Sequence, residues 1–330
     1  MDTPVLISHK TAWLVHHAPR NLVQAVAQRD YQIGVRGLST QQRIARIRQA
    51  LTDCGIPSTM LKTIDISVVF AFERIRTNGV TCHVLGQNLP YDHIDELTPG
   101  IFITDVLAAE WMDRIEYLEY GYEVCGDYRM GLNPSDPYTE QPTTTSKDEI
   151  VELLDRHPGK PGATRARLAL RHIYDHSASP METASSITLS LPTSEGGVGI
   201  RGIELNRPLE IPQRLRHCTK ARTLKIDALV TYQRRELGIE YKGGFHDETE
   251  RKGADAEREA VLAQMGYRIV TLTSAQFASQ LAFHRAMNSI REALGMPRCT
   301  DAEYQRKQNE LRKALIRNWK SAQGEDTPSE

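Results

Sequence analysis

The chain lacks the features that mark several specialised classes of protein. Its five cysteines are widely spread and never form a C-x-x-C pair, so neither a disulfide framework nor a zinc ribbon is expected. No apolar run approaches the roughly 18 residues that a membrane-spanning helix needs. The N-terminus has no apolar segment after a basic start. We therefore expect reduced thiols, no signal peptide and a cytoplasmic protein that does not bind membranes.

The chain also has no surplus of positive charge. Its formal net charge is -1 over 330 residues, so nucleic-acid binding would have to rest on local patches. Hydrophobic residues make up 40% and charged residues 25% of the chain, which is close to the average for globular domains and excludes bulk disorder. A chain of this length accommodates two domains.

Composition predicts where the domains meet. Residues 133–147 contain three prolines and a Thr-Thr-Thr-Ser run, a composition typical of an exposed linker. We expect a mixed α/β domain over 1–132 that recognises a substrate or a partner. A second α/β domain follows over 148–296, and 297–330 form a C-terminal helix with a frayed tail.

The order of elements is clearest in the second domain. Ser179 is a suitable N-cap for a helix with Pro180 at its first position. Beyond that helix, the apolar periodicity predicts strands over 203–211, 223–232 and 237–242, a helix over 254–265, a strand over 267–272 and a helix over 274–294. The expected core is therefore αβββαβ around a central mixed sheet.

Two of the expected strands carry charged positions away from their apolar faces. Apolar residues alternate from Leu224 to Tyr232, and Asp227 interrupts that run although Asp is disfavoured in strands. Glu240 and Lys242, two residues apart on the next strand, share one face. If the strands pair as a hairpin, the three groups meet on one polar surface. Two carboxylates can hold a hard divalent ion that activates water and stabilises charge on a phosphate, and an ammonium can orient that water.

These residues resemble the signature of the PD-(D/E)xK restriction-endonuclease-like superfamily. Asp227 matches its aspartate, Glu240-Tyr241-Lys242 its E-x-K element, and Glu182 its acidic residue on the helix before the sheet. The resemblance implies Mg²⁺-dependent, or Mn²⁺-dependent, hydrolysis of phosphodiester bonds. It implies Glu182, Asp227 and Glu240 as metal ligands and Lys242 as a further catalytic residue. The alternatives are a solvated Glu240–Lys242 ion pair and a nuclease-like fold without activity.

A closer resemblance is to uncharacterised bacterial proteins with a domain similar to very-short-patch-repair endonucleases. The segments that carry it are Leu6–His9, Gly121–Gly126, Ser177–Glu182, Glu204–Asn206, Ile239–Tyr241, His246, Asp255–Arg258 and Val270–Thr273. It implies a DNA endonuclease of phage defence or DNA repair. The chain also resembles, more loosely, abortive-infection antitoxins. Two alternatives therefore stand beside the endonuclease: a non-catalytic DNA-binding regulator and a scaffold subunit of a defence complex.

A basic segment precedes the expected Asp227 strand. Between Ile211 and Ile226 the chain has five cations from Lys and Arg and no acidic residue. Such a patch can neutralise several phosphates, and Lys220 and Arg222 are our candidates for this contact. The alternative is a solubilising surface. DNA is the expected partner, although the pattern does not separate DNA from RNA, and it leaves a homodimer or a defence-complex partner open.

Two further residues near the E-x-K element are candidates for contact with nucleic acid. His246 follows two glycines, so its ring could approach the scissile phosphate or form a hydrogen bond within its own turn. Arg258 lies three residues after Asp255 on one face of the expected helix. It could pair with Asp255 or be directed toward DNA.

Overall fold

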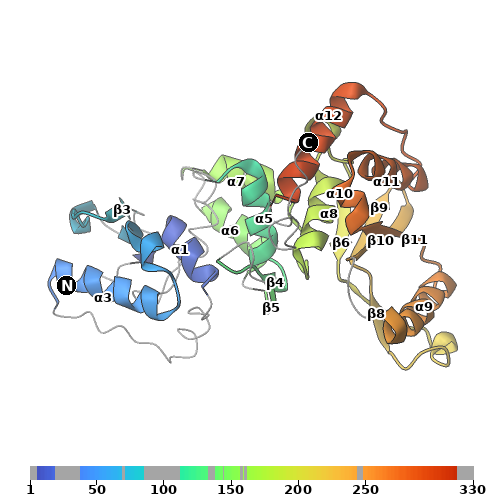
Figure 1. Cartoon of the computed structure of the whole chain (residues 1–330), viewed down its shortest axis with the longest axis horizontal. Coiled ribbons are helices and arrows are strands. Elements are labelled where there is room, and N and C mark those ends of the chain that lie inside the picture. The colour runs from blue at the N-terminus through green and yellow to red at the C-terminus, as the bar shows by residue number, and fades with distance from the viewer. Residues whose placement is uncertain are drawn as a thin grey trace. The chain divides into compact units, whose positions relative to one another are not determined.

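The computed structural model describes residues 6–18, 38–68, 71–84, 112–132, 138–143, 145–156, 159, 162–243 and 248–317 (Figure 1). The chain is mixed α/β, and it divides into two compact units that each combine separate stretches of sequence. Unit 1 comprises Met1–Asp113, Met130–Pro137 and Glu149–Arg167, and unit 2 comprises Arg114–Arg129, Tyr138–Asp148 and Leu168–Glu330.

This division differs from the expected single linker over 133–147. Within that range, β5 (Thr139–Glu140) pairs antiparallel with β4 (Tyr128–Arg129), and the Thr145 N–H donates to the Val124 carbonyl. Residues 149–167, expected in the second domain, belong to unit 1. The observed division differs from the expected one because composition shows where turns are abundant and not the core against which a segment packs.

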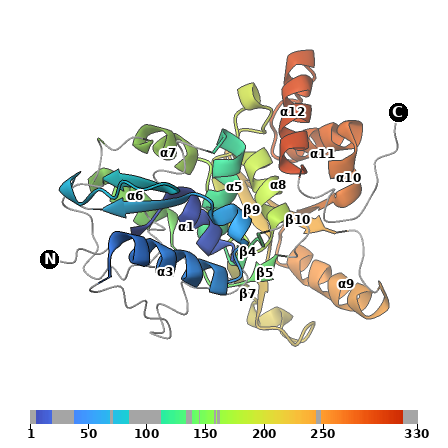
Figure 2. The same cartoon turned by 60° about the vertical axis from the view of Figure 1, so that its left-hand side comes forward.

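Unit 1 is built on a three-stranded sheet in the order β1-β2-β3. The strands are β1 (Leu6–Ile7), β2 (Ile64–Val68) and β3 (Val80–Val84), with β1 antiparallel and β3 parallel to β2. Helices α1 (His9–His16) and α3 (Thr40–Asp53) supply further residues of its core, and both are seen in Figure 2. Ile44, Ile47 and Leu51 recur at helical spacing and are buried on one face of α3. Helices α6 (Lys147–Arg156) and α7 (Ala163–Leu170) contribute residues to the same unit.

The main sheet of unit 2 has the order β11-β10-β9-β6. Its strands are β6 (Gly202–Leu205), β9 (Ala228–Tyr232), β10 (Arg235–Lys242) and β11 (Ile269–Thr273). Strands β9 and β10 form the expected antiparallel hairpin, and β11 lies parallel to β10. Because parallel strands need a crossover, α9 (Glu248–Gln264) connects β10 to β11. Leu229 and Val230, which point to opposite faces, are both buried, so both faces of β9 are covered.

Two expected strands of unit 2 are each split in two. The segment 203–211 becomes β6 and β7 (Pro208–Glu210), and 223–232 becomes β8 (Thr223–Lys225) and β9. Strands β7 and β8 pair with each other in a separate two-stranded sheet. The chain bends between β6 and β7 and again between β8 and β9. The two bends lie opposite each other, because the Asn206 N–H donates to the Asp227 carbonyl. Asn206 has φ 48°, a left-handed conformation that Asn tolerates better than most residues.

Residues 208–225 therefore form an arm, made of β7, the turn η4 (Gln213–Leu215) and β8. Apolar residues of the arm, Ile211 and Leu215, pack against Val261 of α9. Figure 2 shows the arm in gold at the lower edge of the molecule.

The remaining helices of unit 2 are α5 (Arg114–Val124), α8 (Pro180–Ser190), α10 (Ser274–Ala278), α11 (Gln280–Ala293) and α12 (Ala302–Leu315). The expected helix over 274–294 is interrupted at Ser279, whose side chain caps α11. The expected C-terminal helix is α12, and the tail from residue 318 lies outside the described residues. Of the helices described, none combines the length and apolar character needed to cross a membrane.

Candidate functional site

Asp227 lies against the E-x-K strand, at the bend between β8 and β9. Its Oδ2 accepts a hydrogen bond of 2.8 Å from the N–H of Tyr241, the residue between Glu240 and Lys242 on β10. The pairing of Ala228 with Ile239 fixes this position along the hairpin. The hairpin expected from the sequence therefore does bring Asp227 next to the E-x-K element.

Glu182 occupies the first turn of α8 and is held by three donors. Its carboxylate accepts hydrogen bonds from the Ala178 N–H (2.9 Å), the Ser179 hydroxyl (3.0 Å) and the Asn206 amide (2.6 Å). The Ser179 hydroxyl in turn accepts from the Glu182 N–H, so the predicted N-cap is confirmed. Burial raises the pKa of Glu182 even though these three donors favour its ionised form.

Asp227 is largely buried, and the carboxylates of Glu182 and Glu240 act on it electrostatically. Burial raises its pKa from 3.8 to about 7, and the carboxylates of Glu182 and Glu240 add to this shift. The Tyr241 N–H and the Arg258 guanidinium act in the opposite direction. Two further carboxylates thus act on Asp227, and a cation at this place would favour its ionised form.

Arg258 on α9 neutralises Glu240. Its Nη2 donates to Glu240 Oε1 at 2.6 Å, its Nη1 donates to Oε2, and Nη2 also reaches the carbonyl of Lys225. The Glu240 side chain is only 8% exposed. Glu240 was expected on an open polar surface, but it is buried because α9 carries Arg258 over this face of β10. A buried carboxylate needs such a partner. Arg258 was expected to pair with Asp255 or to be directed toward DNA. It binds Glu240, and the Asp255 side chain lies outside the described residues.

Lys242 is at the exposed end of the same strand. Its ammonium contacts Glu259 Oε1 of α9 at 2.8 Å, and the two side chains are 43% and 55% exposed. Among the described residues, the structure shows this ion pair with Glu259 and none between Lys242 and Glu240, the expected alternative. An exposed pair of this kind contributes little to stability, so a phosphate group can compete for the ammonium.

The arm presents the basic residues that the sequence singled out. Lys220 and Arg222 are exposed, and so are Arg214, Arg216 and Lys225. The arm contains one acidic residue, Glu210 in β7, and none from Ile211 to Lys225. His246, the remaining candidate for contact with nucleic acid, lies outside the described residues.

A groove of about 500 Å³ opens beside Glu182. Two of its lining residues contact the site directly: Asn206 donates to Glu182, and the Lys225 carbonyl accepts from Arg258. The lining also includes Tyr174, Lys147, further charged residues of both signs and the apolar residues Ile203, Leu205 and Pro208. The roles of Asn206 and Lys225 were not predicted from the sequence, although Glu204-Leu205-Asn206 is among the segments that carry the closer resemblance.

The fit of a divalent metal depends on Arg258. In the part of the chain that the structure describes, no three His, Cys, Asp or Glu side chains are placed to hold an ion together. The carboxylates of Asp227 and Glu240 are the hard oxygen donors that Mg²⁺ and Mn²⁺ prefer. Arg258 now occupies both Glu240 oxygens. The donor set therefore fits the metal chemically, and binding would require that Arg258 be displaced.

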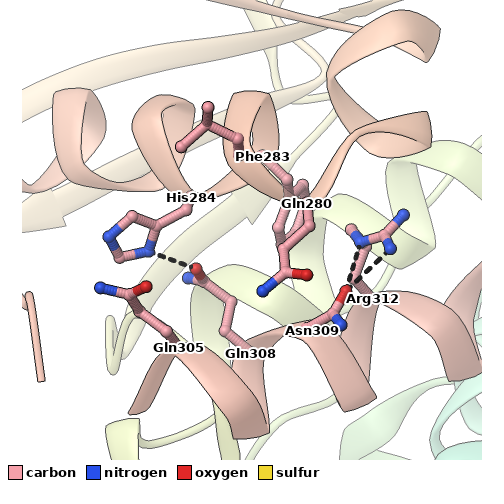
Figure 3. A pocket seen from close by; sticks show the side chains of 8 residues that line it. Gln280, Phe283, His284, Gln305, Gln308, Asn309 and Arg312 are labelled. Carbon is pink, nitrogen blue, oxygen red and sulfur yellow. Dashed lines mark hydrogen bonds between the residues drawn. The ribbon is translucent and has the colours of Figure 1, made fainter. Parts of the chain in front are cut away.

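A smaller hollow of about 150 Å³ lies between α11 and α12 (Figure 3). Several of its polar groups form hydrogen bonds within the protein. His284 Nδ1 is 2.8 Å from Gln308 Oε1, and the Arg312 guanidinium donates to Asn309 Oδ1 and to the carbonyl of Phe277. We interpret this hollow as part of the packing between two helices.

Unit 1 has a cluster of titratable side chains of its own. The rings of His9 and His83 are stacked with centroids 3.4 Å apart, and His83 Nε2 lies 3.3 Å from Asp65 Oδ1. Burial and the neighbouring His83 lower the pKa of His9 to about 4. Since His9 Nδ1 is directed to the Ser8 hydroxyl, we explain the cluster by packing of the start of α1 against β2 and β3.

Comparison with known proteins gives this chain no relatives. It matches no family model, and neither a curated protein nor a solved structure shows significant similarity to it.

Proposed function

We propose that the chain is a metal-dependent DNA endonuclease and that unit 2 is its PD-(D/E)xK-type catalytic domain. The observation that carries this proposal is the hydrogen bond from the Tyr241 N–H to Asp227, which places this carboxylate against the strand of Glu240 and Lys242. An aspartate at the start of one strand and an E-x-K element on its hairpin partner are the residues that the sequence pattern requires.

Each residue has a role that follows from its environment. Asp227 and Glu240 would hold Mg²⁺ or Mn²⁺, which would supply Lewis-acid chemistry and an activated water. Lys242 is exposed and would stabilise the negative charge that develops on the phosphate. Glu182 is engaged by three donors, so we assign it to positioning the start of α8 and Asn206 rather than to binding the metal.

The basic residues of the arm favour binding of a polyanionic substrate. Five exposed cations follow one another from Arg214 to Lys225, and Asp227 comes two residues after the last of them. A nucleic-acid backbone bound along the arm would thus lie near the carboxylates, in keeping with a role in phage defence or DNA repair.

A second candidate function is favoured by one contact. The Arg258 guanidinium donates hydrogen bonds to both oxygens of Glu240. This arrangement is expected of a nuclease-like domain that binds DNA without cutting it. In such a regulator the arm would bind DNA without any divalent metal.

A plasmid-nicking assay distinguishes the two functions. Supercoiled DNA is incubated with Mg²⁺ or Mn²⁺ and with the wild type, D227N or K242Q. D227N keeps an oxygen that can accept from Tyr241, and Lys242 is exposed, so circular dichroism should show both variants folded. We expect wild-type nicking and a loss of about 100-fold or more in each variant, the scale of removing one group that stabilises transition-state charge.

The control is E236Q, which changes an exposed carboxylate on the same strand and should nick like the wild type. Nicking that persists in both D227N and K242Q contradicts the proposed site. A wild type that binds DNA without metal and nicks nothing supports the regulator.

A further inference from the structure

We infer that Arg258 sets the affinity of this site for divalent metal, because its guanidinium is the resident counter-ion of Glu240 that a metal ion must displace. The inference rests on the proposed function, since it takes Asp227 and Glu240 to be the metal ligands. It goes further by assigning a role to a residue outside that ligand set.

The contacts of Arg258 resemble those that a cation would make. The guanidinium binds both oxygens of Glu240 and the carbonyl oxygen of Lys225. All three are oxygen acceptors of the type that Mg²⁺ and Mn²⁺ prefer, and Arg258 is among the charges that influence Asp227. One positive group therefore occupies the oxygen atoms that a metal ion at Glu240 would need.

Arg258 can leave this position without disturbing a hydrophobic core. Its side chain is 29% exposed, and its neighbours on α9, Glu257 and Glu259, are exposed. Glu240 lies on a central strand and is fixed by its register with Thr271 of β11. The mobile partner of the pair is thus the long arginine side chain, and the fixed partner is the carboxylate.

Competition follows from this geometry. A guanidinium and a metal ion cannot occupy the same carboxylate oxygens, so the observed metal affinity is reduced by the free energy of the Arg258–Glu240 contact. Removal of the guanidinium leaves a buried, unpaired carboxylate. In the absence of metal, that carboxylate destabilises the folded protein. Metal binding to it is therefore more favourable.

The test measures metal binding and not cleavage. Thermal unfolding of the full chain is recorded in EDTA and in Mn²⁺, without DNA, and Mn²⁺ affinity is measured by calorimetry. R258Q should have a lower Tm than the wild type in EDTA and a larger rise in Tm with Mn²⁺. Its Kd for Mn²⁺ should be at least about tenfold lower than the wild-type value. The double variant E240Q/R258Q should lose this gain.

R306Q is the matched control. Arg306 makes a comparable two-point contact with the Glu303 carboxylate on α12, far along the chain from the site. R306Q should bind Mn²⁺ like the wild type. If R258Q does not fold in EDTA, R258K keeps the charge but not the planar fork, and it should bind Mn²⁺ more tightly than the wild type by a smaller factor.

The outcomes separate this inference from the proposed function. If the wild type binds Mn²⁺ and neither R258Q nor R258K binds it more tightly, the role of Arg258 is overturned and the metal site stands. If no protein in the series binds Mn²⁺, the metal-dependent function is overturned, and the role of Arg258 with it.

Discussion

Asp227 shows how burial changes the chemistry of a single residue. Its pKa is raised from 3.8 to about 7, first by burial and then by Glu182 and Glu240. The folded protein therefore keeps a proton on Asp227 between about pH 4 and 7, where the unfolded chain has released it. Stability that depends on this proton is present at low pH and is lost as the pH rises through that range, by up to about 1.4 kcal/mol per pH unit.

We predict that D227N removes this pH dependence, because asparagine does not titrate. The free energy of unfolding is measured by urea denaturation from pH 4 to 8 for the wild type and D227N. The wild type should lose stability relative to D227N between pH 4 and 7, with no further divergence above pH 7.5. Parallel curves would mean that Asp227 is ionised throughout, which contradicts its burial.

Sequence periodicity predicted part of this site at the level of single residues. The alternation along two strands placed Asp227, Glu240 and Lys242 near one another, and Ser179 was identified as the cap of α8. The partner of Glu240 was not predicted, because Arg258 lies 18 residues away on a helix. Which face of that helix meets the sheet depends on tertiary packing, and the i, i+3 spacing to Asp255 suggested another partner.

At the level of elements, the bend between β8 and β9 could not be predicted from the pattern. Ile226, Ala228 and Val230 are all buried, so the alternation of apolar residues continues through the bend. The main chain changes its pairing partner at this point, from β7 to β6 and β10. Asn206 on the opposite segment, with its left-handed φ, is the residue that permits the matching bend.

Gly238 is predicted to be essential for the packing of β10 against β11. A Cβ at this position would lie 2.4 Å from Ile269 Cδ1 and 3.2 Å from Ile226 Cγ2. We expect G238A to lower the free energy of unfolding by about 1–3 kcal/mol, as overpacking of a core usually does. Urea denaturation measures this loss.

The control for this prediction is G243A, just beyond the end of the same strand. Of the described residues, only Tyr241 Cε1 would meet a Cβ there, at 3.8 Å. This is an ordinary contact, so stability should stay within about 0.5 kcal/mol of the wild type. Equal losses in the two variants would contradict a packing cause.

At the level of the whole molecule, the sequence predicted the mixed α/β class correctly, whereas the structure divides the chain at other places than the expected linker. Each unit takes segments from both sides of the expected linker. Hydrophobic periodicity is a local property, so it identifies a helix without indicating the core against which that helix packs. Strand pairing such as that between β4 and β5 is likewise decided by tertiary contacts.

Charge distribution leads to the last prediction. The whole chain has a net charge of -1, so attraction of DNA must come from a local patch, and the arm is the one we propose. Contacts with phosphates release counter-ions, and each lost contact lowers the slope of log affinity against log salt concentration by about 0.9. The variant K220A/R222A should therefore bind duplex DNA more weakly at low salt, with a slope smaller by up to about 2. Fluorescence anisotropy at several salt concentrations, without divalent metal, measures both quantities.

R285A/K313A provides a control of equal charge. It also removes one arginine and one lysine, both exposed, but these lie on α11 and α12. If total charge attracted DNA, the two double variants would weaken binding equally. If the arm makes the contacts, only K220A/R222A changes the slope, because counter-ions are released only where phosphates are bound. Equal slopes in both variants and the wild type would show that the arm does not contact DNA phosphates. The groove beside Glu182 would then be the next candidate surface of unit 2.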